Sequence, residues 1–139
     1  MANVERHYLG LPHGLHLGAS NLGKDNYGIY RDSTHQIILD LDHLRYDSPD
    51  TVLNTVLHEA YHAFEHRCWD IYVETDLENK SLMLFQKARM YGNEFAAYED
   101  GSEDFNKYYM QECEIDAREY AEEGVKEYLR RIREFYDEQ

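Results

Sequence analysis

The stretch from residue 49 to about residue 66 constrains the fold more than any other part of this chain. Apolar residues recur there at intervals of three and four, the spacing that places side chains on one face of an α-helix. Ser48, Pro49 and Asp50 are residue types that favour a helix N-cap, a first helical position and a first turn. We therefore predict an amphipathic helix whose apolar stripe packs against a core: Val52, Leu53, Val56, Leu57, Ala60, Ala63 and Phe64.

The other patterns complete an α+β prediction. Two β-prone runs, at 27–31 and 36–41, flank a polar turn and predict a hairpin. Helical patterns cover about 77–98 and 111–136, and Gly124 weakens the latter helix by about 1 kcal/mol relative to alanine. Residues 1–24 are predicted to be irregular, with one short strand at most. We expect one domain over residues 1–139, with a short β-hairpin or small antiparallel sheet packed on three helices.

The charge of the chain excludes several partners. The sequence holds 28 acidic and 14 basic residues, for a formal net charge of −14. Such a balance argues against nucleic acid and against an anionic membrane surface. No apolar run approaches the roughly 20 residues that span a bilayer. With two cysteines and no signal-peptide pattern, we expect a cytoplasmic protein with free thiols. The sequence does not indicate an oligomeric state.

The predicted central helix contains His58-Glu59-Ala60-Tyr61-His62, which matches the pattern H-E-x-x-H. Because His58 and His62 are four residues apart, both imidazoles project from one face and can bind one metal ion. Glu59 lies about 100° around the helix from His58, where it can accept a proton from water beside the metal. We predict a zinc site with Glu59 as general base. The alternative is an ordinary helix with two surface histidines and a solvated glutamate.

A catalytic zinc site needs a third protein ligand. The metzincin spacing does not fit, because Glu65 stands where that pattern has glycine. Glu114 is the better candidate, since it shares one helix face with Ala117 and Ala121, and small alanines allow a close approach to the H-E-x-x-H helix. The alternative is that Glu114 belongs to a solvated face of a Glu-rich helix.

The H-E-x-x-H helix followed by Glu114-Ile115-Asp116-Ala117 and Tyr120-Ala121 resembles the small gluzincin metallopeptidases, especially the ImmA/IrrE-like group of compact bacterial and phage proteins. The resemblance covers residues 27–121. It implies a minimal zincin-like metallopeptidase core in which His58, His62 and Glu114 bind Zn²⁺. It also implies that Glu59 is the catalytic base and that the substrate is a protein or peptide. The strand at 37–41 would be the edge that pairs with an extended substrate.

The residues that support catalysis stay open. The family often has Asn or Asp four residues after the ligand Glu, to support a ligand histidine. This chain has Arg118 there, and Asp116 is a possible substitute. Four side chains are candidates to stabilise the developing oxyanion: His66, Tyr108, Tyr109 and Tyr120.

Two functions stay open as well. The first is a zinc-dependent metallopeptidase that hydrolyses peptide bonds of an intracellular protein. The alternative is a zinc-stabilised binding or immunity-type adaptor module without turnover, which the missing supporting residue and the acidic, Tyr-rich composition favour.

Overall fold

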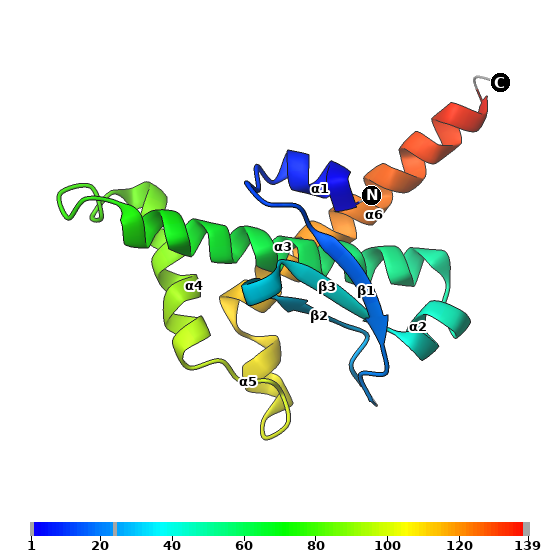
Figure 1. The fold of residues 1–139 in the computed structure, drawn as a ribbon, viewed down its shortest axis with the longest axis horizontal. Coiled ribbons are helices and arrows are strands. Elements are labelled where there is room, and N and C mark those ends of the chain that lie inside the picture. Colours follow the sequence, from blue (N-terminus) through cyan, green and yellow to red (C-terminus); the bar gives the residue numbers. More distant parts are fainter. Residues whose placement is uncertain (1, 24, 138–139) are drawn as a thin grey trace.

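The computed structural model describes residues 2–23 and 25–137. It has α+β architecture, in which α3 crosses the molecule and the sheet lies against it (Figure 1). Among the described helices, none combines the length and the apolar character that crossing a bilayer requires. The elements are α1 (Ala2–Tyr8), β1 (His16–Ser20), β2 (Gly28–Arg31), β3 (Gln36–Asp40), α2 (Leu41–Tyr46), α3 (Pro49–Glu74), α4 (Gln86–Ala96), α5 (Phe105–Tyr109) and α6 (Glu112–Asp137), with 3-10 turns at Asp32–Thr34 and Met83–Phe85.

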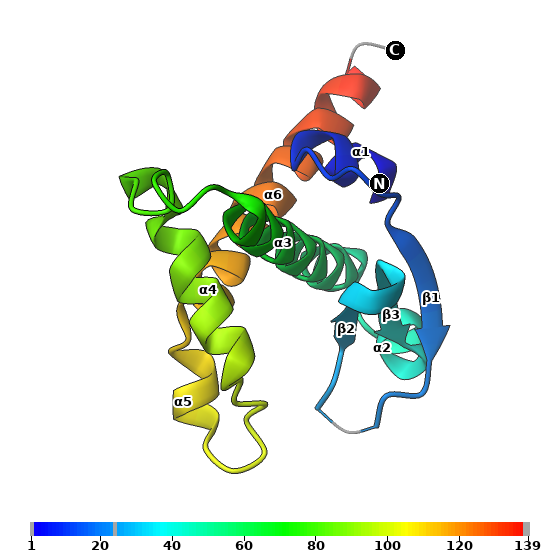
Figure 2. The same ribbon diagram turned by 60° about the vertical axis from the view of Figure 1, so that its left-hand side comes forward.

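The central helix begins where the sequence predicts and continues eight residues beyond the predicted end. Ser48 Oγ accepts a hydrogen bond from the Thr51 backbone N–H at 3.2 Å, which is the expected N-cap. The apolar stripe is confirmed at its centre, where Val56, Leu57 and Ala60 are fully buried. Figure 2 views α3 nearly along its axis, with the sheet on one side and α4 and α5 on the other. The helix is therefore the element on which every other layer packs.

The predicted hairpin is confirmed as the antiparallel pair of β2 and β3, but the sheet also contains a third strand and is mixed rather than antiparallel. Its order is β1-β3-β2, with β1 parallel and β2 antiparallel to β3. β1 comes from the segment predicted to be mostly irregular, and its largely exposed residues explain why it carries no alternating apolar pattern. β3 is the central strand, with Ile37, Ile38 and Leu39 buried. The prediction that 37–41 forms the substrate edge is therefore wrong, and the strand edge beside the cleft described below belongs to β2.

The described residues contain six helices rather than three, and the predicted helix over 77–98 is wrong in its first half. Residues 75–82 turn back on themselves, with Lys80 Nζ donating to the Val73 carbonyl at 3.0 Å and Arg89 donating to the Lys80 carbonyl at 2.8 Å. Leu77 and Met83 are exposed there rather than packed in a core. The reversal lets α4 return along α3, where Trp69 packs directly on Gly92.

Helix α6 packs closely on α3 through small side chains. Cys113, Ala117 and Ala121 are fully buried there, as the predicted close approach requires. A Cβ on Gly124 would lie 2.8 Å from Leu57 Cδ1, so this glycine allows the contact rather than merely weakening α6.

Buried Glu5 of α1 links this helix to α6 by hydrogen bonds. The carboxylate of Glu5 accepts hydrogen bonds from the hydroxyls of Tyr120 and Tyr128, the latter at 2.5 Å. Glu5 is buried, and its two partners follow it by 115 and 123 residues. The segment predicted to be irregular therefore begins with a helix that is tied to the opposite end of the chain.

Candidate metal centre

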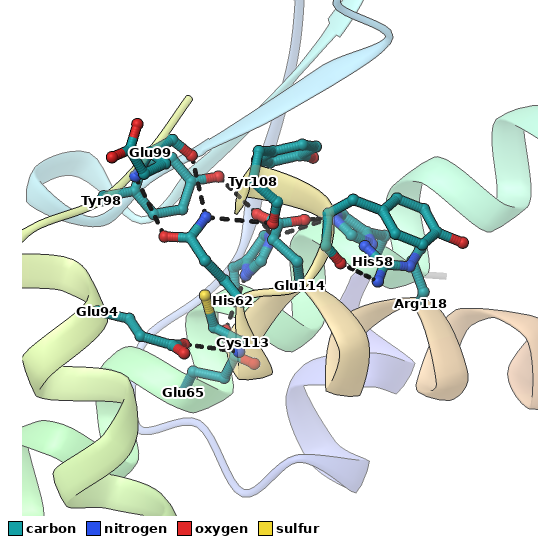
Figure 3. Close-up of polar contacts among 12 residues, drawn as sticks. His58, His62, Glu65, Glu94, Tyr98, Glu99, Tyr108, Cys113, Glu114 and Arg118 are labelled. Atoms are coloured by element: carbon teal, nitrogen blue, oxygen red, sulfur yellow. Dashed lines mark hydrogen bonds and ion pairs between the residues drawn. The ribbon is translucent and has the colours of Figure 1, made fainter. Parts of the chain in front are cut away.

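The structure brings the three predicted ligands together at the contact between α3 and α6 (Figure 3). His58 and His62 project from one face of α3, and Glu114 from the first turn of α6. The two imidazole Nε2 atoms are 3.0 Å apart. The Glu114 carboxylate lies 3.3 Å from His58 Nε2 through Oε2 and 3.6 Å from His62 Nε2 through Oε1.

This donor set fits a metal ion in two respects. Ligand atoms about 2.0 to 2.1 Å from a tetrahedral zinc ion stand about 3.3 Å from one another, and the three separations here fall on either side of that value. Glu114 Oε2 is also buried without a hydrogen-bond partner. Such burial is unfavourable for a carboxylate oxygen unless a cation or a hydrogen-bond donor binds it. Two imidazoles and one carboxylate are a donor set that catalytic zinc sites use.

Glu65 holds His62, a role that the sequence analysis left open. Glu65 is fully buried on α3, and its Oε2 lies 2.8 Å from His62 Nδ1. A hydrogen bond donated from Nδ1 leaves the Nε2 lone pair free to face a metal. The signal was present in the sequence, since Glu65 follows His62 by three residues and therefore lies on the same helix face.

Asp116 and Arg118, the two residues considered for that supporting role, lie elsewhere. Asp116 accepts hydrogen bonds from Lys87 and, at 2.5 Å, from the Tyr91 hydroxyl. Arg118 stacks on the ring of Tyr109 and donates to its carbonyl. Both therefore serve the packing around α6 and do not contact the histidines.

Glu114 is held from two directions by residues that the sequence analysis did not identify. The Tyr98 hydroxyl donates to its Oε1 at 2.5 Å. Glu94 of α4 accepts the backbone N–H groups of Glu112 and Cys113, at 2.8 and 2.9 Å, and so caps the first turn of α6. Neither contact has a sequence signal, because each joins segments that meet only through the docking of α4.

The carboxylates around His62 favour a positive charge between them. Burial alone would lower the pKa of His62, but its hydrogen bond to Glu65 and the charges of Glu59, Glu65 and Glu114 raise it to about 9. Burial alone would raise the pKa of Glu114, but the close approach of His58, the charges of both histidines and the hydrogen bond from Tyr98 lower it to about 2. The carboxylates therefore favour one positive charge at this point, either a proton on His62 or a metal ion that replaces that proton.

Glu59 lies beside the three residues, where α3 meets β2, and only 7% of its surface is exposed. Burial raises its pKa, while the charges of His62 and His58 oppose that rise. Gly28 makes the close approach possible, because a Cβ there would lie 2.6 Å from Thr55 Cγ2 and 3.3 Å from Glu59 Cγ.

The cluster opens into a cleft of about 830 Å³ between β2 and the segment that joins α4 to α6. Of the four candidates for stabilising an oxyanion, His66 and Tyr108 line this cleft. The Tyr109 ring instead lies against Arg118, and the Tyr120 hydroxyl donates to Glu5. Tyr98, which was not among the candidates, lines the cleft as well.

Comparisons of the chain with protein-family models, with curated proteins and with solved structures found no match. The resemblance to gluzincins therefore stays a prediction from the motif residues.

Proposed function

We propose that this chain is a zinc-dependent metallopeptidase of the gluzincin type with a minimal zincin-like core. The observation that carries the proposal is the convergence of His58, His62 and Glu114 at separations of 3.0 to 3.6 Å, with an unpartnered buried carboxylate oxygen among them. The proposal is supported by Glu59, an acid at the position where H-E-x-x-H enzymes carry their general base.

The metal ion and the side chains of the protein would contribute different parts of the reaction. A zinc ion at this centre supplies a Lewis acid that polarises a carbonyl group and makes water more acidic. Glu59 accepts a proton from the attacking water at its carboxylate and later returns it to the leaving amine. A pKa raised by burial suits both halves of that transfer, because the carboxylate must bind the proton and then release it.

The cleft residues then position the substrate. Tyr108 and His66 are the candidate donors to the developing negative charge, since both line the cleft. The edge of β2 offers backbone groups to an extended peptide, because β2 pairs with β3 on one side and lines the cleft through Gly28, Ile29 and Tyr30.

Metal content and turnover test the proposal together. Purified wild-type protein should hold about one zinc per chain by mass spectrometry, and His62→Ala and Glu114→Ala should lose it. Zinc-loaded wild type should cut a quenched fluorescent peptide library, and Glu59→Gln should bind zinc but cut at least about a hundredfold more slowly. Protein without stoichiometric zinc, or a Glu59→Gln variant that cuts at the wild-type rate, would refute the proposal.

One observation favours the alternative, a zinc-stabilised adaptor without turnover. Glu59 is almost completely buried, as a structural carboxylate would be. An adaptor predicts that zinc raises the melting temperature of wild type and Glu59→Gln equally and that neither cuts any peptide in the library.

A further inference from the structure

The cleft beside the metal centre is lined by acids. Outside the candidate metal centre and Glu59, the charged residues of its described lining are Asp25 and Asp100, and no lysine or arginine is among them. They lie at opposite walls, Asp25 before β2 and Asp100 in the segment after α4. The stretch from Glu99 to Asp104 holds four acidic residues and no basic one. A substrate side chain that enters this cleft meets negative charge on both sides.

The wall on the Asp100 side is also aromatic. The rings of Tyr98 and Tyr108 meet edge to face with centroids 6.3 Å apart, and the ring of Phe105 lies 6.0 Å from that of Tyr108. All three line the cleft, and Phe105 is 63% exposed. Exposed aromatic faces attract ammonium and guanidinium groups, so this wall adds a second and independent preference for cations.

Asp100 is oriented and ionised. Its Oδ1 accepts the Ser102 backbone N–H at 2.8 Å, and hydrogen bonds from Ser102 lower its pKa. Gly101, with φ of 81°, turns the chain so that it packs on the Tyr108 ring, where a Cβ would lie 3.3 Å from the ring. The turn that holds the Asp100 carboxylate therefore also packs on the aromatic wall. Carboxylates at the walls of a cleft also raise the local concentration of cations from solution.

We propose that the cleft selects polypeptide segments rich in lysine or arginine, whose side chains reach Asp25, Asp100 and the aromatic wall on either side of the metal centre. This inference rests on the proposed peptidase function, because it takes the occupant of the cleft to be a peptide. The preference belongs to the cleft and not to the overall charge of −14.

The test measures binding and cleavage separately. Binding uses zinc-loaded Glu59→Gln, so that the probe is not consumed, and fluorescence anisotropy of three labelled peptides of equal length in which alanine alternates with lysine, glutamine or glutamate. The cleft variant adds Asp25→Asn and Asp100→Asn. Asparagine tolerates the φ of 72° at position 25 and keeps an acceptor for Ser102 at position 100. The matched control adds Glu119→Gln and Glu122→Gln, two exposed acids of α6.

The lysine peptide should bind about tenfold more tightly than the glutamine peptide at physiological salt. The cleft variant should reduce that preference to about twofold or less, and the α6 control should keep it. Equal binding of the three peptides overturns the inference, as does a preference that both double variants reduce equally or that the cleft variant keeps.

Cleavage by zinc-loaded wild type separates this inference from the proposed function. If wild type cuts the three peptides at equal rates, the peptidase proposal stands and the selectivity is overturned. If the lysine peptide binds with the expected dependence on Asp25 and Asp100 but is never cut, the selectivity stands and the peptidase proposal fails.

Discussion

Glu94 caps the helix that carries Glu114, so its replacement should weaken both the fold and the metal centre. In Glu94→Gln the side chain keeps its size and one acceptor oxygen. It loses one of the two hydrogen bonds, at 2.8 and 2.9 Å, from the backbone of Glu112 and Cys113. It also loses a negative charge at a helix N-terminus, where such charges are favourable.

The two losses set the size of the effect. A hydrogen bond to a charged group contributes about 1.5 kcal/mol or more, reduced to about 1 kcal/mol here because Glu94 is partly exposed and water can replace it. The helix-terminus charge adds about 0.5 kcal/mol. At about 2.1 cal/mol/K of unfolding entropy per residue, a 139-residue chain loses about 3.4 °C per kcal/mol, so we expect a decrease in Tm of about 5 °C.

Differential scanning calorimetry of the metal-free protein and zinc competition with a chromophoric chelator are the two assays. Glu94→Gln should also bind zinc on the order of tenfold more weakly, since the turn that presents Glu114 is less well ordered. Glu122→Gln is the matched control, because it removes the same charge from an exposed position of α6. If the two variants melt at the same temperature and bind zinc equally, the carboxylate of α4 does not hold the ligand helix.

Three further predictions follow from close contacts and from titration. In Gly92→Ala the new Cβ would lie 2.1 Å from Trp69 Cε3, so urea unfolding should show a loss of about 1 to 3 kcal/mol despite the better helix propensity of alanine. Glu65→Gln should weaken zinc binding about tenfold or more in the chelator competition, because the bond to His62 loses its charge. Backbone N–H groups, first that of Leu22, lower the pKa of Asp40, so its stabilising effect is present above the ordinary Asp pKa of about 3.9 and is lost as the pH falls through the lower folded value. The difference in Tm between wild type and Asp40→Asn should therefore shrink between neutral pH and about pH 3.

Each of these has a control or an opposing outcome. A Cβ on Gly14 meets nothing within 4 Å, so Gly14→Ala should leave the unfolding free energy nearly unchanged, and a similar loss in both alanine variants would contradict the steric argument. Asp116→Asn should keep zinc affinity, since Asp116 contacts Lys87 and Tyr91 rather than a histidine. If Asp116→Asn loses as much zinc affinity as Glu65→Gln, Glu65 is not the specific support of His62. A constant Tm difference for Asp40→Asn across pH would exclude the carboxylate charge as its source.

Elements with a clear local sequence pattern were predicted correctly. The start of α3 and the extent of α6 follow from capping residues and helical spacing, and the approach of the two helices follows from Ala117 and Ala121. The meeting of His58, His62 and Glu114 was predictable for the same reason, because each helix presents them on the face that the other helix covers.

Contacts between distant segments account for what the sequence did not predict. β1 is short and mostly exposed, so its parallel pairing with β3 has no pattern of its own. Glu94 and Tyr98 reach the first turn of α6 only after the chain reverses at residues 75–82. Glu65 is different, because its separation of three residues from His62 is enough to predict their contact on one helix face. The sequence analysis used Glu65 only to reject the metzincin spacing.

The bond between α1 and α6 has a consequence for how the chain is made. A ribosome delivers Glu5 first, and its partners Tyr120 and Tyr128 only after 115 and 123 more residues. Until then the carboxylate lacks both of these hydrogen-bond donors, so the link between α1 and α6 forms late. A nascent chain stalled before Tyr120 should be cut by protease within α1 more readily than a chain that extends beyond Tyr128. Helix α6 thus completes the placement of α1, although nearly the whole described chain lies between them.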